Sequence, residues 1–280
     1  MTIDLHMHST ASDGELSPAA LMQFAAGLGV TTIALTDHDT AAGVAEARAA
    51  AHGLGMQFYS GIEVSCQWGK RCIHVVGLGI DEDDAALAVA IERFAQQRAR
   101  RARDIADKLM ALGCPDLCER AVEIAPNKAV ISRNHFAQAL IEAGVVKNQQ
   151  EAFDRFLGDN APAFVMAPWP ELTAAVDLIR GAGGVAVLAH PGRYSFKKDW
   201  MLDGLVEEFV QAGGRAVEVV SGSQPAEFTP RCLDWARKYD LAVSVGSDFH
   251  SRKGIRPLPG QAGPMPEGMT PVTALVSQVI

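Results

Sequence analysis

The sequence predicts an α/β fold in which helices cover a parallel sheet and a helical segment interrupts the alternating pattern. Short apolar runs rich in β-branched residues alternate with amphipathic helical stretches over most of the chain, as is typical of βα units. Between about Glu92 and Pro170 this alternation gives way to one helix after another, rich in Arg, Ala and Leu. We therefore expect a sheet domain formed by residues 1–91 and 171–280, with an inserted helical subdomain at 92–170.

The elements before the insertion can be followed in order. A helical pattern in LSPAALMQFAAGLG precedes the apolar run TTIALTDHD, which ends in polar residues. Next, MQFYSGIEVSC and RCIHVVGLGI are predicted as successive strands joined through Trp68, Gly69 and Lys70.

After the insertion the pattern predicts three more strands, GGVAVLAHPG, RAVEVVSG and LAVSVGSDFH, separated by helices near 201–212 and 227–239. The tail after Ile255 contains five prolines. We expect this tail to wrap over the surface.

Composition narrows the classes of function. The chain has 280 residues, 48% of them hydrophobic, which is ample for a sizeable core. Its net charge of −8 argues against broad nonspecific binding to nucleic acid or anionic membranes, but allows a local basic pocket. With no signal-peptide pattern and no run approaching a membrane span, we expect a cytoplasmic protein.

The cysteines argue against disulfides and against a thiolate zinc site. Their number is odd and no CxxC pair is present. We expect buried or incidental thiols at Cys66, Cys72, Cys114, Cys118 and Cys232.

The stretch TIDLHMHSTASDG places two histidines and an aspartate directly after an apolar strand signal. His6 and His8 flank Met7, so on an extended chain both imidazoles project to one face. Asp13 follows in a Ser/Asp/Gly turn, where the chain can curl back toward them. Taken alone, this stretch is either half of a metal site or an ordinary polar loop.

Other histidines and carboxylates occupy similar places. Six of the eight histidines lie in or just after predicted strands, while His52 lies on a predicted surface helix and His135 in the insertion. The carboxyl ends of the strands of a βα barrel converge on one mouth, so these side chains should meet there. A single Asp after a strand usually caps the next helix, but many such coincidences favour a site. The group comprises His6, His8, His38, His74, His190 and His250, with Asp13, Asp37, Asp39, Glu63 and Asp248.

Imidazole and carboxylate without thiolate suit divalent manganese, iron or zinc, and a carboxylate such as Glu63 can bridge two ions. Paired ions polarise a phosphoryl oxygen and generate hydroxide near neutral pH, so we expect hydrolysis. No GxSxG elbow, P-loop or dinucleotide fingerprint offers another chemistry.

The ordered motifs DLHMHSTASDGE, ALTDHDT, GIEVS, IHVVG, LAHPGRY and VGSDFH resemble the PHP (polymerase and histidinol phosphatase) superfamily over nearly the whole chain. The segments ISRNHFAQAL and FDRFLGDNAPAFV resemble the subgroup of nucleoside 3',5'-bisphosphate phosphatases and 5'-3' ribonucleases. The family motif more often has proline where this chain has Asn134. The resemblance implies a distorted (βα)7 TIM-like barrel with an inserted helical subdomain.

The resemblance also implies three sets of metal ligands. The first ion would take His6, His8, Glu63 and Asp248, the second Asp13, His38 and His250, and the third Glu63, His74 and His190. We expect Asp13, His38, Glu63 and His250 to act in catalysis. The expected cofactors are two or three divalent ions, with manganese preferred over iron, zinc or magnesium.

Phosphate is best held by guanidinium groups and charge-assisted hydrogen bonds. We therefore expect substrate binding by Arg133, Asn134 and His135 in the insertion and by Arg193 after His190. Arg100 and Arg103 in QQRARRARDI are weaker candidates, because a basic helix is usually a solvated face.

The expected function is a metal-dependent phosphatase that removes the 3'-phosphate of nucleoside 3',5'-bisphosphates, with the insertion covering the barrel mouth. The substrate partner is then a small phosphorylated nucleotide, or short RNA ends, and neither a membrane nor a protein partner is implied. The alternatives are a histidinol-phosphate-type monoester phosphatase, a 5'-3' exoribonuclease on short RNA, and a noncatalytic interaction domain stabilised by metal.

Overall fold

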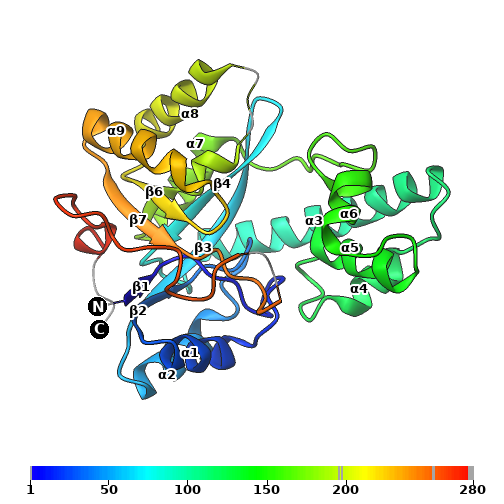
Figure 1. The fold of residues 1–280 in the computed structure, drawn as a ribbon, viewed down its shortest axis with the longest axis horizontal. Coiled ribbons are helices and arrows are strands. Elements are labelled where there is room, and N and C mark those ends of the chain that lie inside the picture. The colour runs from blue at the N-terminus through cyan, green and yellow to red at the C-terminus, as the bar shows by residue number, and fades with distance from the viewer. Residues whose placement is uncertain (1, 195, 197, 254–255, 277–280) are drawn as a thin grey trace.

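The fold is a nearly closed barrel of strands with helices outside it and a helical lobe at one side (Figure 1). The computed structural model describes residues 2–194, 196, 198–253 and 256–276. Over these residues seven strands form one sheet in chain order. The strands are β1 (Thr2–Asp4), β2 (Val30–Leu35), β3 (Gln57–Trp68), β4 (Arg71–Leu78), β5 (Val185–Leu188), β6 (Ala216–Ser221) and β7 (Ala242–Gly246).

The sheet is mixed, which corrects the expectation of a parallel sheet. The pairs β1·β2, β2·β3, β5·β6 and β6·β7 are parallel, whereas β4 runs antiparallel to both β3 and β5. The reason is the link between β3 and β4, where Gly69 and Lys70 form a tight turn. A parallel pair needs a crossover of a dozen or more residues, so two residues dictate a hairpin.

The ends of the sheet approach each other across the barrel. The Leu5 N–H donates to the carbonyl of Val245 at 3.0 Å, and Met7 forms a parallel bridge with Phe249. The buried carboxylate of Asp4 accepts hydrogen bonds from the N–H groups of Ser247 (2.9 Å) and Gly260 (2.7 Å). Segments from the two ends of the described chain thus close the barrel.

The barrel helices pack outside the sheet (Figure 1). Ser17 caps the first of them by accepting a hydrogen bond from the N–H of Ala20, with Pro18 in its first turn. These helices are α1 (Pro18–Gly27), α2 (Val44–Gly53), α7 (Leu172–Gly181), α8 (Asp199–Gln211) and α9 (Thr229–Tyr239), with short 3-10 turns at Pro191–Arg193, Ala226–Phe228 and Val272–Ala274.

The helical lobe has an apolar core of its own, centred on residues such as Phe136 and Leu140. It contains α4 (Cys118–Ile124), α5 (Arg133–Glu142), α6 (Gln149–Ala152) and a π-helical turn at Phe153–Leu157. The long helix α3 (Ala85–Ala111) joins the two parts, because Leu87 and Phe94 pack in the barrel core and Leu109 in the lobe core. The predicted boundary at residue 92 therefore falls inside α3.

The tail does more than wrap over the surface. Val272 and Val276 are buried with Leu5, and the Val243 N–H donates to the carbonyl of Thr270 at 2.8 Å. Residues 277–280 of the tail, and residues 254–255 directly before it, lie outside the described residues. All five cysteines are free thiols. Among the described residues, no helix combines the length and apolar character that crossing a membrane requires.

Candidate metal centre

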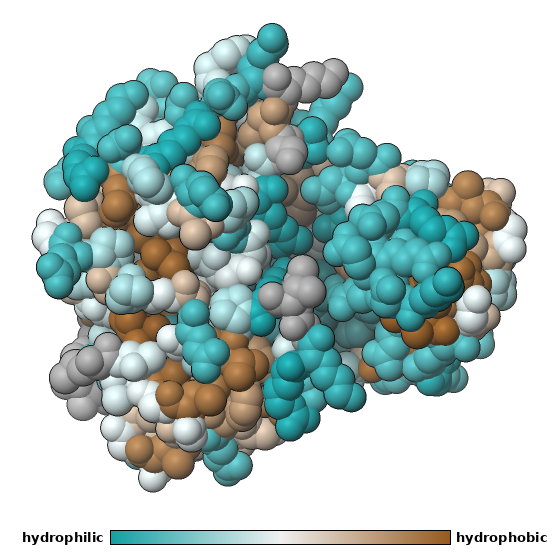
Figure 2. Space-filling view, in the orientation of Figure 1, coloured by the Kyte–Doolittle hydropathy of each residue, from teal (hydrophilic) through white to brown (hydrophobic). Residues whose placement is uncertain are grey.

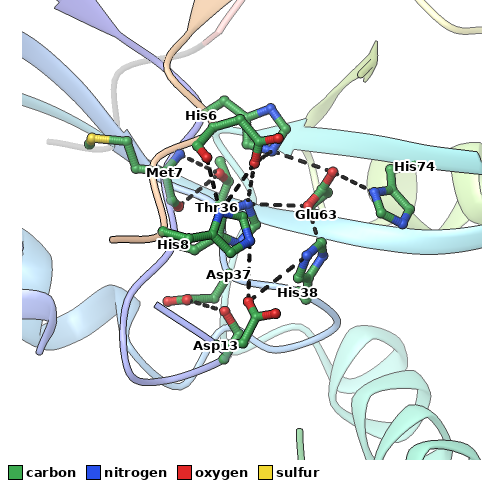
Figure 3. A network of polar contacts seen from close by, with 12 residues as sticks. His6, Met7, His8, Asp13, Thr36, Asp37, His38, Glu63 and His74 are labelled. Carbon is green, nitrogen blue, oxygen red and sulfur yellow. Dashed lines mark hydrogen bonds and ion pairs between the residues drawn. The ribbon is translucent and has the colours of Figure 1, made fainter. Parts of the chain in front are cut away.

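The residues that follow β1 carry two buried imidazoles into the barrel mouth (Figure 3). Backbone hydrogen bonds fix this segment from both sides, because the His8 N–H donates to Phe249 O (2.9 Å) and the Met7 N–H to Thr36 Oγ1 (3.0 Å). The extended backbone turns His6 and His8 to the same side of the chain, and their ring centroids lie 5.2 Å apart.

Asp13 returns toward these histidines from the turn that follows them. Its Oδ1 lies 3.4 Å from His250 Nε2 and 4.0 Å from His38 Nε2, and its side chain is only 2% exposed. The ring of His250 lies 4.1 Å from that of His8. Three segments distant in sequence thus meet around one carboxylate oxygen.

The carboxylate of Glu63 is at the centre of the cluster and is fully buried. Glu63 comes from β3, which supplies it in mid-strand, and its N–H donates to Asp37 O (3.0 Å). Its two oxygens face five imidazoles: His6 Nε2 at 3.4 Å, His8 Nε2 at 3.3 Å, His38 Nδ1 at 2.7 Å, His74 Nδ1 at 2.8 Å and His190 Nε2 at 3.0 Å.

Left-handed backbone occurs beside the cluster. Four non-glycine residues of the described chain have positive φ, and three of them are Asp39 (52°), His190 (32°) and Asp248 (51°). Such conformations cost free energy and gather at functional sites, where the surrounding structure holds them. These residues therefore adopt backbone conformations that they rarely adopt by themselves, and the surrounding structure holds their side chains at the cluster.

The imidazole nitrogens and carboxylate oxygens of the cluster are suitable ligands for divalent metal ions. Within the described residues, buried nitrogen and oxygen atoms of His6, His8, Asp13, His38, Glu63, His190 and Asp248 have no hydrogen-bond partner. Leaving buried polar atoms unpaired is costly, and a bound cation would satisfy them. Four sets have ligand atoms within 4.8 Å of one another: His8, Asp13, His38 and His250; His6, His8 and Asp248; His6, Glu63 and His190; and His38, Glu63 and His74.

Metal binding requires neutral imidazoles and ionised carboxylates, and the protonation states of His8, His190 and Glu63 meet this requirement. Burial lowers the pKa of His8 to about 4 and that of His190 to about 3. Burial opposes ionisation of Glu63, but the charges of His38 and other imidazoles hold its pKa well below the ordinary value. Burial also opposes charge on His74, yet Glu63 raises its pKa to about 10, so this imidazolium balances a negative charge that a divalent ion would neutralise instead.

Sequence reasoning missed the carboxylate of Glu218, which supports the cluster from behind. Glu218 Oε1 lies 3.1 Å from His6 Nδ1, and Oε2 accepts the His190 N–H at 2.7 Å. A carboxylate that fixes the second nitrogen of a ligating imidazole is common in metal sites. Its signal in the sequence is a single charged residue inside the apolar run RAVEVVSG.

The segment after His250 contributes an unforeseen cation. Arg256 Nη1 lies 3.0 Å from Asp248 Oδ1, donates to Asp248 O at 2.9 Å, and contacts the ring of His250. Nothing in the pattern around Arg256 marks it, because its position depends on how the tail folds back.

Asp37 and Asp39, which flank His38, serve the surrounding loops. Asp37 accepts hydrogen bonds from Ser9 and from the hydroxyl of Ser12 (2.5 Å). Asp39 Oδ2 accepts hydrogen bonds from Arg98 Nε (3.0 Å) and Nη2 (2.5 Å), and both side chains are buried. These contacts hold the loop after β2 that carries His38.

The predicted substrate residues of the insertion lie at the start of α5. Arg133 donates to Asp159 Oδ1 (2.7 Å) and Leu157 O (3.0 Å). Asn134 donates to Asp13 Oδ2 at 2.7 Å. His135 is buried, and its Nδ1 accepts the Ser132 N–H in a capping box at the start of α5.

The other predicted cations lie in different surroundings. Arg193 is an exposed residue directly beyond the His190 loop; burial of its guanidinium opposes its charge, but Asp248 together with Glu63 and Asp159 raises its pKa, so it lies near the cluster. Arg100 is exposed on α3. Arg103 pairs with Asp107 (2.9 Å) and Asp116 (3.0 Å) within the lobe, so the structure does not bring it to the cluster. Figure 2 shows a hollow lined largely by hydrophilic residues between the barrel body and the lobe.

Comparisons with known proteins agree with this architecture. Residues 4–96 match the PHP domain family. The chain is 40% identical over 261 residues to a 3',5'-nucleoside bisphosphate phosphatase from Chromobacterium violaceum, covering 93% of this chain and 89% of the relative. It is 40% identical over 247 residues to a 5'-3' exoribonuclease from Haemophilus influenzae, covering 88% and 89%. The solved structure of an amidohydrolase from Chromobacterium violaceum, with bound sulfate and no metal, matches with a TM-score of 0.92 and 38% identity over 98% of this chain and 95% of that one.

Proposed function

The chain belongs to the PHP-domain phosphoesterases, and from this premise we propose that it is a metal-dependent phosphatase that removes the 3'-phosphate of nucleoside 3',5'-bisphosphates and leaves nucleoside 5'-monophosphates. The observation that carries the proposal is the buried cluster of imidazoles and carboxylates around Glu63, whose unpaired atoms fit metal ions. Similarity to the bisphosphate phosphatase, which extends over the lobe as well as the barrel, supports the choice of substrate.

The proposed ligand sets are those expected from the motifs. His6, His8, Glu63 and Asp248 would hold one ion, Asp13, His38 and His250 a second, and Glu63, His74 and His190 a third. Divalent ions in these sets, manganese above all, supply Lewis acidity to a phosphoryl oxygen and lower the pKa of a coordinated water. A cytoplasmic location is part of the same proposal.

The residues of this chain prepare the site for a dianionic group. Glu218 orients His6, and the loop held by Asp37 and Asp39 orients His38. Burial of the cluster strengthens every electrostatic interaction with a bound phosphate. The barrel therefore supplies a rigid, preorganised reaction centre.

The second phosphate would be anchored between the lobe and the barrel. The guanidinium of Arg133 lies against the rings of Phe153 (5.7 Å) and Phe164 (5.5 Å) and is held at one nitrogen by Asp159, which fixes its direction. Arg193, exposed beside the His190 loop, would approach the same anion from the barrel. Anchoring a remote group places the reacting phosphate in a near-attack geometry.

A second candidate function is 5'-3' exoribonuclease action on short RNA. It is favoured by the relative from Haemophilus influenzae and by the hollow beside the lobe, which is open in Figure 2. The same anchor would hold the 5'-phosphate of an RNA end. In both reactions the bond to the 3'-oxygen would be broken, but the phosphate attacked is a monoester in the bisphosphate and a diester in RNA. The length of the substrate and the esterification of this phosphate therefore separate the two candidates.

The test compares kcat/KM for adenosine 3',5'-bisphosphate, 3'-AMP, histidinol phosphate and a 5'-phosphorylated oligoribonucleotide, with Mn²⁺ present. We expect the bisphosphate to exceed 3'-AMP at least roughly tenfold, about 1.4 kcal/mol of differential transition-state binding. Arg133→Ala should remove this advantage mainly by raising KM. Equal values for the bisphosphate and 3'-AMP would contradict the anchor, and preference for the oligoribonucleotide or histidinol phosphate would contradict the proposed substrate.

A further inference from the structure

Two amide side chains of the helical segment reach across to the turn that carries Asp13. Asn134 Nδ2 donates to Asp13 Oδ2 at 2.7 Å, although the two residues are 121 positions apart. Asn127 Nδ2 donates to the carbonyl oxygen of Ala11 at 2.7 Å. Both amides are partly buried, and both bonds join the lobe side of the molecule to the same short turn.

The two bonds differ in what they fix. The bond from Asn127 ends on a backbone carbonyl, so it holds the path of the turn. The bond from Asn134 ends on the side-chain carboxylate of Asp13, so it also fixes the rotation of that carboxylate about its last torsion. Only the second bond bears on the direction of the carboxylate oxygens.

The carboxylate of Asp13 has two oxygens in different surroundings. Oδ2 is held by Asn134, whereas Oδ1 is buried, has no hydrogen-bond partner within the described residues, and lies 3.4 Å from His250 Nε2. With Oδ2 fixed on the lobe side, Oδ1 is aimed at His250 and His38. The amide thus selects which oxygen faces the imidazoles.

Asn134 is itself held in the required orientation. Its Oδ1 accepts a hydrogen bond from Gln149 Nε2 at 3.0 Å, so the Nδ2 side of the amide is directed to Asp13. Its backbone N–H donates to Ser132 Oγ (3.1 Å), which places it in the first turn of α5. The row Gln149, Asn134, Asp13 therefore runs from α6 through α5 to the barrel mouth.

We propose that Asn134 is a positioning residue that orients Asp13 for the ion shared with His38 and His250, and that it does not act by binding the substrate phosphate. This inference rests on the proposed function, because it takes Asp13 as a metal ligand. Residues that orient a ligating carboxylate typically change metal affinity 10- to 100-fold when they are replaced. The lobe is then connected to the reaction centre through one ligand.

The experiment measures Mn²⁺ binding by isothermal titration calorimetry, with ion content by elemental analysis, on the full chain. The variants are Asn134→Ala, Asn134→Leu, which keeps the branched heavy-atom skeleton of the side chain but removes its donor, and Asn127→Ala, which removes the matched amide bond to the same turn. Thermal unfolding of each variant checks that it is folded. If Asn134→Ala does not fold, Asn134→Leu provides the test.

We expect both Asn134 variants to bind one ion of the complement at least about tenfold more weakly, with the other affinities unchanged. Raising the Mn²⁺ concentration should restore kcat, with KM for the bisphosphate close to the wild-type value. Asn127→Ala should keep all affinities. An unchanged Mn²⁺ isotherm, an equal loss in Asn127→Ala, or a rise in KM alone would overturn the inference.

Asp13→Asn separates this inference from its premise. If Asp13→Asn loses one ion while the Asn134 variants lose none, the role of Asn134 is wrong and the ligand set stands. If Asp13→Asn keeps the full complement and affinity, the assignment of Asp13 as a ligand fails, and the role of Asn134 fails with it.

Discussion

His6 Nδ1 and Glu218 Oε1 lie 3.1 Å apart, and both side chains are almost completely buried. Burial opposes charge on His6, but Glu218 together with Glu63 raises its pKa well above the ordinary value. Because one ring nitrogen is held by Glu218, the other, Nε2, is directed at Glu63 at 3.4 Å. The carboxylate behind the ring therefore sets the direction in which His6 offers a ligand atom.

Replacing Glu218 should weaken metal binding without removing a ligand. In Glu218→Gln the neutral amide orients His6 and the His190 loop less firmly, so we expect a 10- to 100-fold loss of Mn²⁺ affinity. Titration calorimetry measures the loss. Glu207→Gln, an exposed replacement of the same kind on α8, is the control. Wild-type affinity in Glu218→Gln would show that the 3.1 Å contact does not govern the position of His6.

Removing metal should abolish hydrolysis. We expect dialysis against a chelator to eliminate phosphate release from adenosine 3',5'-bisphosphate, and added Mn²⁺ to restore it, because the cluster around Glu63 would then lack its cations. Replacing Glu63 by alanine should lower kcat by orders of magnitude at any Mn²⁺ concentration. Full turnover by protein shown by elemental analysis to be free of metal would contradict the proposal.

The buried pair of Arg98 and Asp39 should be important for stability. Arg98→Met leaves Asp39 buried with the Ser65 N–H as its only hydrogen-bond donor among the described residues, so the free energy of unfolding should fall by about 3–5 kcal/mol. Arg100→Met, exposed on the same helix, should change it by less than about 0.5 kcal/mol. Urea unfolding of both variants measures the difference, and equal values would refute the special role of the pair.

His135 should make stability depend on pH. Burial lowers its pKa from the ordinary 6.5, and its Nδ1 must stay unprotonated to accept the Ser132 N–H. The unfolded chain therefore takes up a proton at this residue at a higher pH than the folded protein does, so the free energy of unfolding falls as the pH drops through 6.5.

His135→Gln isolates this contribution, because glutamine preserves the capping box but does not titrate. Between about pH 7.5 and pH 5.5 the wild type should lose more stability than the variant. Chemical unfolding at the two pH values, at one fixed Mn²⁺ concentration, measures this difference. The contributions of the other histidines are common to both proteins and therefore cancel. Parallel losses in the two proteins would mean that His135 is protonated in the folded state as readily as in the unfolded state.

The sequence was most informative where local pattern and chemistry coincide. Alternation predicted that His6 and His8 share a side, and the strand signals before His38 and Asp248 predicted that these residues meet at one end of the barrel. The direction of β4 was missed, although the two-residue link at Gly69 and Lys70 indicated a hairpin. Local sequence patterns predict single helices and strands well. The direction in which two strands pair depends instead on the length of the segment that connects them.

Helical spacing could also have identified the inward arginines of α3. Arg98 and Arg101 lie one turn from Phe94 and Ile105 on the buried stripe, whereas Arg100 and Arg103 lie off it. No local pattern places Arg256 against Asp248, because that contact depends on the three-dimensional path of the tail.

The closure of the barrel has a consequence for biosynthesis. Asp4 and Ser247 are 243 residues apart, and their hydrogen bond joins the two edges of the sheet. A ribosome releases His6, His8 and Glu63 long before it releases Asp248 and His250, so the nascent chain holds an incomplete ligand set for most of its synthesis. A frameshift or early stop before β7 would therefore leave histidines that can capture stray ions but cannot assemble the complete centre, and would leave the edge of β1 open to pairing with other chains.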